Sequence, residues 1–265
     1  IKFLKDQLLS NPIIFRKTIN KVEKIDGKIN IHFTDGLNDI VDYLVVADGV
    51  FSNTKPVIEK KEIKPVYSGA VAFRTQIKNQ DILNFNSKNI SLIMSSGAHI
   101  VLYPVNQRDE INLVCIVRKK LEKAEATKVL LENTIFKENK SLADLFKGDL
   151  KSWPIYTSKK PVKSIYKNVL YVGDAFYAFL PTFAQGASQS IESANELFND
   201  LKSNSSDYYK NRISRTKQIN FRSSLNHFAF HLSNPFNIFF RNIFLKHLSK
   251  NKNFLESYLG KIYNN

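Results

Sequence analysis

Two patterns of apolar positions predict two kinds of strand near the start of the chain. In residues 28–36, apolar and polar side chains alternate up to an Asp-Gly turn, which is typical of a strand with one face in solvent. Residues 44–47 form a continuous apolar run that ends at Asp48-Gly49. Such a run predicts a strand covered on both faces, as in a parallel sheet.

The middle of the chain changes from strand-like to helix-like patterns. Residues 63–118 contain β-branched and aromatic segments separated by polar turns, which predicts an antiparallel sheet. Residues 120–148 are rich in good helix formers and predict helix. A second buried strand is predicted at 168–172, and residues 206–265 are mostly helix-like, with Pro235 as an interruption.

Apolar residues after the second buried strand recur at helical spacing and lie on one stripe, the pattern of an amphipathic helix. They are Ala187, Ile191, Ala194, Leu197, Phe198 and Leu201. The order of these segments predicts an α/β fold (α+β overall), in which an antiparallel sheet is inserted between two parts of a nucleotide-type domain.

Composition changes this picture in two ways. The chain has 39 Lys and Arg against 24 Asp and Glu, a net charge of +15, but most of these cations are scattered lysines. Sequence-specific nucleic-acid readers rely on arginine, so we interpret the charge as a solvated lysine surface and expect no nucleic-acid partner, with an anionic ligand or membrane as the alternative. The single cysteine, Cys115, excludes a disulfide within the chain and fits a reducing, cytoplasmic compartment.

Gly173-Asp174 and Gln185-Gly186-Ala187 are candidates for a binding site. Ligands of open α/β sheets bind beyond the carboxyl ends of the strands, where Asp174 could accept hydrogen bonds from ribose or ribityl hydroxyl groups. Gly186 would let a ligand approach a helix start, whose free N–H groups stabilise negative charge. A turn and a glycine loop of purely structural role explain the same spacing, and taken alone that interpretation is favoured, as it is for Asp48-Gly49.

Taken together, the two segments DYLVVADGVFS and LYVGDAFYAFLPTFAQGASQSIESA resemble the FAD-dependent aromatic hydroxylases of the para-hydroxybenzoate hydroxylase type, and more closely the salicylate hydroxylase-like branch. That family carries a strand ending in ADG-x-x-S, and GDAAHP-x-x-P followed by QG-x-x-x-x-IEDA. The matching residues are Ala47-Asp48-Gly49, Ser52, Gly173-Asp174-Ala175, Pro181, Gln185-Gly186 and Ile191-Glu192-Ser193-Ala194. GAHIVLYPV and YYKNRISRTKQ also resemble the family's substrate-domain strand and its Tyr–Arg–Arg helix.

The resemblance implies roles for these residues. Asp174 would bind the ribityl chain of FAD, Gly186 and Ala187 would offer N–H groups to the pyrimidine side of the flavin, and Pro181 would lie along the ring. Asp48 would help to hold the FAD-domain loops and would affect use of the nicotinamide cofactor. The implied cofactor-binding set is Asp48, Gly49, Gly173, Asp174, Pro181, Gln185, Gly186 and Ala187, and the implied substrate-facing set is Phe73, Arg74, Tyr103 and Pro104.

The implied reaction is hydroxylation of an aromatic substrate, a phenolic or heteroaromatic acid, with O2 and NADH or NADPH through a flavin C4a-hydroperoxide. A quinone-pathway type of flavoprotein hydroxylase is the alternative within the enzyme class. A non-catalytic remnant or interaction module that keeps the fold is the alternative outside it.

Two departures from the family pattern stand out. Tyr177-Ala178 occupies the place of the family's His-Pro, and no G-x-G-x-x-G fingerprint occurs in the chain. We therefore expect the chain to be the C-terminal part of a hydroxylase, without the N-terminal dinucleotide-binding segment, and to bind FAD weakly or not at all by itself. The expected domains are 1–60 with 155–205 for FAD, 61–154 for substrate, and 206–265 as a helical region.

Other signals favour packing over chemistry. His227 and His231 are one helical turn apart, but no third ligand is nearby in the sequence, so we expect packing residues and no metal. Cys115 is expected to be a buried, inert thiol. Gly186-x-Ser188 only begins to match a nucleophile elbow, since the second glycine is replaced by Ser190.

The segment 234–263 combines a wide apolar face with lysines. It could lie in a membrane interface. Packing against the rest of the fold or against the partner of a homodimer is the favoured interpretation.

Overall fold

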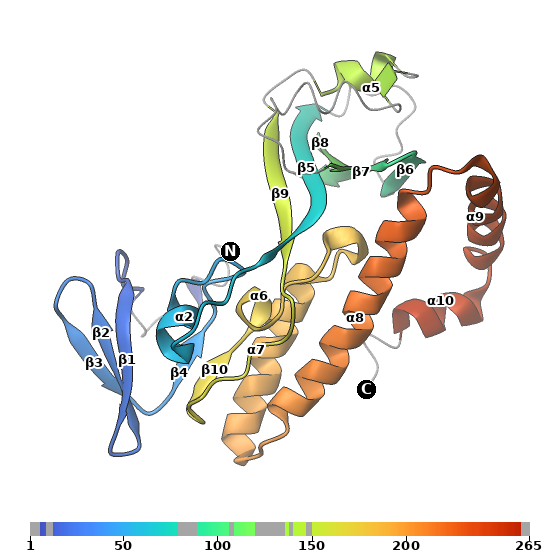
Figure 1. Ribbon diagram of the computed structural model, residues 1–265. Coiled ribbons are helices and arrows are strands. Elements are labelled where there is room, and N and C mark those ends of the chain that lie inside the picture. Colours follow the sequence, from blue (N-terminus) through green and yellow to red (C-terminus); the bar gives the residue numbers. More distant parts are fainter. Residues whose placement is uncertain are drawn as a thin grey trace. The chain divides into compact units, whose positions relative to one another are not determined.

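The computed structural model describes residues 6–8, 13–78, 89–105, 109–119, 136–137, 140–146 and 150–260. The chain divides into two compact units (Figure 1). The first contains residues 1–64 and 160–177, and the second contains residues 65–159 and 178–265. The three-part functional division expected from the sequence stays a prediction.

A three-stranded antiparallel sheet forms one part of the first unit. It consists of β1 (Ile19–Ile25), β2 (Lys28–Phe33) and β3 (Asn38–Val41). Ile29 and Ile31 of β2 are buried, whereas most of β3 is exposed. The strand predicted within residues 28–36 is therefore present, but Asn30, between the two isoleucines, is buried as well, so burial does not alternate along β2.

Two short parallel strands form the other sheet of the first unit. β4 (Leu44–Val46) pairs with β10 (Val169–Tyr171), in the register Val46 opposite Tyr171. All three residues of β10 are buried, but Val45 is 44% exposed. The sequence predicted that the strand at 44–47 is covered on both faces, and among the described residues this is wrong, because β10 lies beside β4 in the plane of the sheet and covers neither face.

The second unit is built on an antiparallel sheet of five strands in the order β6-β7-β8-β5-β9. The strands are β5 (Val66–Lys78), β6 (Ser91–Ser95), β7 (Ala98–Val105), β8 (Glu110–Arg118) and β9 (Lys151–Thr157). The prediction of an antiparallel sheet in residues 63–118 is confirmed. β9 lies outside that range and pairs with the edge of β5. The sheet therefore includes a strand that follows, in the sequence, the region predicted to be helical.

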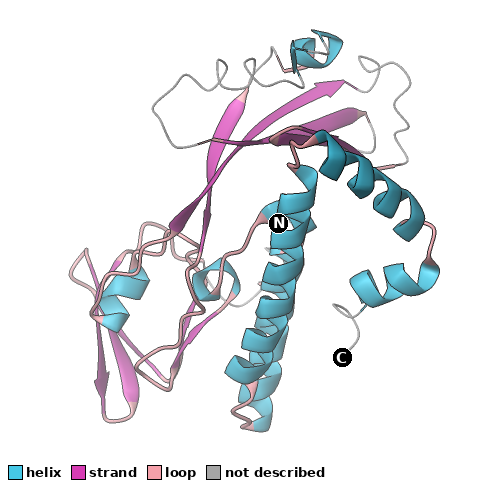
Figure 2. Ribbon diagram, turned by 45° about the vertical axis from the view of Figure 1, so that its right-hand side comes forward, coloured by secondary structure: helices cyan, strands magenta, loops and turns pink. Residues whose placement is uncertain are grey.

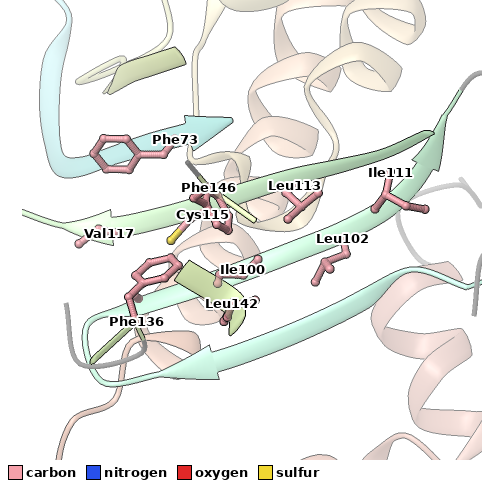
Figure 3. Close-up of a cluster of buried hydrophobic side chains, with 11 residues drawn as sticks. Phe73, Ile100, Leu102, Ile111, Leu113, Cys115, Val117, Phe136, Leu142 and Phe146 are labelled. Atoms are coloured by element: carbon pink, nitrogen blue, oxygen red, sulfur yellow. The ribbon is translucent and has the colours of Figure 1, made fainter. Parts of the chain in front are cut away.

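One face of the five-stranded sheet carries the hydrophobic core of the second unit (Figure 3). Alternate residues of β5, β7 and β8 meet side chains from the short helix α5 (Lys140–Asp144) and its flanks. The buried set is Phe73, Ala98, Ile100, Leu102, Ile111, Leu113, Cys115, Val117, Phe136, Leu142 and Phe146. The Cys115 thiol is completely buried, and burial raises its pKa, as expected for an inert thiol.

Helices complete the chain (Figure 2). After α2 (Thr54–Glu59) and α6 (Gly173–Phe176) in the first unit, the second contains the 3-10 turn η3 (Pro181–Phe183), α7 (Gly186–Ser203), α8 (Tyr208–Phe230), α9 (Pro235–Leu248) and α10 (Lys252–Leu259). Pro235 is the first residue of α9, where its missing N–H costs nothing, and Asn234 caps that helix. The predicted interruption at Pro235 is confirmed.

The buried face of α7 is polar. Its buried residues are Gln189, Ser193 and Leu197, whereas Ile191 and Phe198 are exposed. The apolar stripe read from the sequence therefore lies mostly outside the packed face in the described part of the chain. The reason lies in α8, which offers α7 an arginine rather than an apolar surface, as described below.

The fold is a mixed α/β structure with parallel and antiparallel sheets and C-terminal helices, which agrees with the predicted class at this level. Most of the helix predicted for 120–148 lies outside the described residues; within it, α5 is helical. Of the helices in the described ranges, each is too short or too polar to cross a bilayer.

Candidate functional site

Asp48 and Asp174 follow the paired ends of the two parallel strands. Val46 and Tyr171 are register partners, and the chain turns away two residues later in each case, at Asp48-Gly49 and at Gly173-Asp174. Both glycines have left-handed backbones, with φ of 81° at Gly49 and 55° at Gly173. A side chain would strain either turn, so glycine is what allows both carboxylates to stand at this edge of the sheet.

Hydrogen bonds tie Asp48 to the start of α2. Asp48 Oδ2 accepts the N–H of Thr54 at 3.2 Å, and Ser52 Oγ accepts the N–H of Lys55 at 3.0 Å. At the other end of α2, Glu59 Oε1 accepts a hydrogen bond of 2.7 Å from the hydroxyl of Tyr171. The ADG-x-x-S segment thus caps α2, and α2 is held against β10.

Lys55 is a buried cation at the same edge of the sheet. Its side chain is 2% exposed, although it follows a turn of polar residues in the sequence. Burial lowers the pKa of its ammonium group, and the charges of Asp48 and Asp174 oppose that shift. The carboxyl ends of β4 and β10 therefore gather two carboxylates and one lysine.

The pKa of Asp174 is also shifted by its surroundings at this edge of the sheet. Its side chain reaches the surface, but the surrounding protein atoms still displace enough water to raise the pKa of its carboxyl group, while Lys55 lowers it. An ionised carboxylate is a strong acceptor for hydroxyl groups, and the charge of Lys55 favours that form. This chemistry fits the ribityl role that the sequence implied for Asp174.

The other predicted cofactor residues lie in the second unit, around η3 and the start of α7. Pro181 begins η3, and the side chain of Thr182 donates to the carbonyl of Ser223 on α8 while the Thr182 carbonyl accepts from Asn226 at 3.1 Å. Ala184 then takes a left-handed conformation with φ of 53°. Such a backbone is costly for alanine, and it turns the chain into α7.

The start of α7 is open to a ligand. Gly186 and Ala187 are exposed, and the Gln185 side chain makes no capping hydrogen bond to the helix. A Cβ added at Gly186 would meet nothing within 4 Å, so the protein itself does not require glycine there. Free N–H groups at the positive end of an 18-residue helix, with a bare backbone in front, fit the anionic part of a flavin.

A buried arginine holds the first turns of α7 in place. Arg212 of α8 is 1% exposed, and its Nη2 donates to Gln189 Oε1 at 2.9 Å and to the Gln189 carbonyl at 3.3 Å. Its Nη1 donates to Glu192 Oε1 at 3.2 Å, and Arg215 Nε pairs with the same carboxylate oxygen at 3.0 Å. The Tyr–Arg–Arg helix recognised in the sequence thus anchors α7 rather than lining a site.

Tyr208 completes this anchor, since its hydroxyl lies 2.8 Å from Ser193 Oγ. Burial raises the pKa of the Tyr208 hydroxyl to about 12. All three residues of the Tyr–Arg–Arg pattern therefore contact the polar face of α7, which explains why that face is buried.

Ala178 shows what stands in place of the family proline. Its N–H donates to Ser158 Oγ at 2.9 Å, and its carbonyl accepts the N–H of Ser158 at 2.8 Å. Proline could not make the first of these bonds. A pair of hydrogen bonds to the end of β9 thus restrains the chain where the family uses a ring.

The four predicted substrate-facing residues lie on two faces of the five-stranded sheet. Phe73 is in the hydrophobic core, and Arg74, the next residue, points to the opposite face, where its guanidinium lies 5.5 Å from the centre of the Trp153 ring. The register Arg74–Val114–Val101 places Tyr103 on the face of Arg74 and Pro104 on that of Phe73. The substrate-facing role of these residues stays a prediction.

Three histidines meet on the face of the sheet opposite the core. His231 Nδ1 donates to the carbonyl of His227 at 2.7 Å, and its Nε2 lies 3.0 Å from Nδ1 of His99 on β7. Burial, with the neighbouring histidines, lowers the pKa of His99 to about 3 and that of His227 to about 4. His227 and His231 pack as the sequence predicted, and no cluster in the described ranges has three side chains arranged to hold a metal ion.

Sequence reasoning missed Lys55, Arg212 as an anchor, and His99. No local pattern marks a lysine as buried. The signal for Arg212 was present, because its helix was recognised as a family motif, but its partners Gln189 and Glu192 lie 23 and 20 residues away. His99 is paired with a residue 132 positions later, which no spacing rule reaches.

Comparison with known proteins gives a consistent set of relatives, although no family model matches the chain. It is 23% identical to 3-amino-4-hydroxybenzoate 2-monooxygenase of Streptomyces cremeus over 224 residues, 80% of this chain and 56% of the relative. It is 23% identical to salicylate hydroxylase of Pseudomonas putida over 206 residues, 68% of this chain and 48% of the relative. The chain thus spans about half the length of the curated relatives it matches.

A solved structure shares the fold. The Klebsiella pneumoniae protein HpxO, complexed with FAD and uric acid, superposes with a TM-score of 0.76 at 16% identity, over 98% of this chain and 69% of that one.

Proposed function

This chain is a distant homologue of the FAD-dependent aromatic hydroxylases, and from that relationship we propose that it is the flavin- and substrate-binding part of an FAD-dependent monooxygenase. The parent enzyme hydroxylates an aromatic substrate, a phenolic or heteroaromatic acid, with O2 and NADH or NADPH. When bound, FAD supplies the redox chemistry, passing electrons from the nicotinamide to oxygen. The protein residues bind and orient the flavin and the substrate, and they exclude water from the site.

The observation that carries the proposal is the open start of α7. Gly186 has free space around it and serves no packing purpose in the described structure, so its bare backbone is best explained by a ligand that approaches closely. The N–H groups of Gly186 and Ala187 then stabilise negative charge on the pyrimidine side of the flavin. Arg212 keeps this helix start in position through Gln189.

Asp174 and its neighbours supply the second part of the proposal. Asp174 would accept hydrogen bonds from the ribityl hydroxyl groups, and the charge of Lys55 lowers the pKa of its carboxyl group, which favours the ionised form. Asp48 and Gly49 shape the adjacent turn, since Asp48 caps α2. Pro181 would provide a rigid, apolar surface for the flavin ring.

Flavin binding by single variants tests the proposal. Gly186→Val adds a side chain into free space, so the fold is kept while close approach of a ligand is blocked. Asp174→Asn keeps the shape of the side chain and removes its charge. With the upstream coding sequence included, the parent protein should show a flavin absorption spectrum and substrate-stimulated oxidation of NADH or NADPH, and both variants should weaken flavin binding at least tenfold.

The outcomes separate the alternatives. A parent protein that folds but binds no flavin would mean a non-catalytic interaction module. Flavin binding that neither variant weakens would show that the cofactor lies elsewhere. A quinone-pathway substrate in place of an aromatic acid would leave the flavin assignments intact and change only the substrate.

A further inference from the structure

Helix α9 carries an exposed aromatic surface. Phe236, Phe239, Phe240, Ile243 and Phe244 are between 42% and 69% exposed. Their spacing places all five on one side of the helix. We call these five side chains the α9 aromatic face. In the described part of the chain this face does not pack against the rest of the fold, which was one of the two kinds of packing favoured from the sequence. The other, packing against the partner of a homodimer, stays a prediction.

The opposite side of α9 already has its contacts. Arg241 is buried, and its Nη1 donates to the carbonyl of Ala229 at the end of α8 at 3.2 Å. Ile238, Leu245 and Leu248 on that side are partly buried. Both views show α9 leaving the end of α8, and α10 returning toward α8, where Tyr258 donates to Asn226 at 2.8 Å (Figures 1 and 2). A helix that carries apolar residues on two sides and is packed on only one of them calls for a second apolar partner.

The aromatic side chains are organised before any partner binds. The rings of Phe236 and Phe240 are 4.6 Å apart edge to face, and those of Phe239 and Phe240 are 5.6 Å apart. Such mutual packing restricts the rotamers of the rings, so less conformational entropy is lost when the face is buried.

Charge decides which partner fits. Between residues 232 and 260 the cations Arg241, Lys246, Lys250 and Lys252 face one acid, Glu256, a net charge of 4 − 1 = +3. The three lysines are exposed, and α9 itself contains no acidic residue. The whole chain carries +15. A second copy would bring like charges together, whereas an anionic surface would be attracted.

We propose that the α9 aromatic face docks on the surface of a membrane rich in anionic lipid, with the phenylalanines at the boundary of headgroups and acyl chains and the lysines on the phosphates. A helix of 14 residues is about 21 Å long, too short to span a bilayer, so it lies in the plane of the interface. The proposal is independent of flavin binding.

Vesicle flotation of the purified 265-residue chain tests this docking. Vesicles of phosphatidylcholine with about 30% phosphatidylglycerol should carry the chain upward, and vesicles of phosphatidylcholine alone should not, because each lysine near an anionic surface contributes about fivefold to partitioning. High salt should weaken the binding.

Substitutions distinguish binding through the α9 aromatic face from non-specific hydrophobic binding. Phe239→Ser with Phe244→Ser removes two exposed rings and should lower vesicle binding at least tenfold. Ile191→Ser with Phe198→Ser is the matched control, since both side chains are more than 60% exposed on α7 and should leave binding unchanged. Lys246→Glu with Lys250→Glu should lower binding to the anionic vesicles without unfolding the chain.

Three results would overturn the proposal. The chain fails to float with anionic vesicles, or the α7 control lowers binding as much as the α9 variant does. The third is sedimentation that reveals a dimer broken by the α9 substitutions, together with no flotation, which would assign the face to a second copy of the chain.

Discussion

The charge of Lys55 opposes the effect of burial on the carboxyl group of Asp174. Burial raises the pKa of Asp174, and Lys55 lowers it. Asp174, with Asp48, in turn favours the charged form of Lys55, whose pKa burial lowers. At the carboxyl ends of β4 and β10, each group thus helps the other to stay ionised.

Replacing Lys55 by methionine should therefore raise the pKa of Asp174. Carbon-detected NMR titration of the aspartate carboxyl groups measures this directly. The ionised carboxylate is disfavoured in the folded state, so stability falls as pH rises above the unfolded value of 3.8, and in Lys55→Met this fall should extend to higher pH. Lys61→Met, at an exposed site, is the control, and an unchanged Asp174 titration in Lys55→Met would contradict the assignment.

The histidine cluster should make the second unit sensitive to acid. The folded-state pKa of His99 is about 3 and that of His227 about 4, below the ordinary histidine pKa of 6.5, so the unfolded chain binds more protons than the folded one as pH falls. Stability is complete above pH 6.5 and is lost progressively below it, by about 2 kcal/mol at pH 5 from His99 alone.

Urea unfolding at a series of pH values checks the effect of the cluster. His99→Phe removes one titrating group from the sheet, so its stability should depend less steeply on pH between 6.5 and 4 than that of the unchanged chain. Equal slopes for the two proteins would show that the acid sensitivity arises elsewhere.

The hydrogen bond from Ala178 to Ser158 should contribute measurably to stability. Ser158→Ala leaves the buried N–H of Ala178 without its acceptor, at a cost of about 1–3 kcal/mol. Chemical denaturation gives the value. Ser158→Thr keeps the hydroxyl group and should stay close to the unchanged protein; a loss as large as that of Ser158→Ala would point to packing and not to the hydrogen bond.

Arg212 should control how firmly α7 is held. Arg212→Met removes the donors to Gln189 and Glu192. Arg215 still pairs with Glu192, but the buried side-chain oxygen of Gln189 loses this donor, which costs about 1–3 kcal/mol. Hydrogen exchange should show lost protection in the first turns of α7 before its last turns. Lys217→Met, on the exposed side of α8, should leave the exchange of α7 unaltered.

The strands and turns of this fold are largely predictable because their signals are local. The strand within 28–36 and the strand at 169–171 were each predicted from the pattern of apolar residues over a few adjacent positions. Gly49 and Gly173 mark the turns because the backbone there is left-handed. The motif residues Asp174 and Gly186 could be identified from the sequence because each belongs to a short contiguous segment.

The face that a helix buries was not predictable in α7. The apolar stripe predicted that Ile191 and Phe198 are buried, whereas the structure buries Gln189 and Ser193. A prediction from hydrophobic periodicity assumes that the neighbouring surface is apolar. Helix α8 instead presents Arg212 and Tyr208, which form hydrogen bonds with polar residues of α7.

By itself, the sequence determined the element types, the positions of the strand-end turns, and the two motif segments that suggest a flavin site, because each depends on neighbours a few residues apart. Only the tertiary structure decided that Lys55 is buried near two carboxylates, that His99 joins His231, and that the α9 aromatic face is left exposed. Burial and charge pairing depend on residues that are distant in the chain and close in space, and the sequence does not specify that closeness before the chain folds.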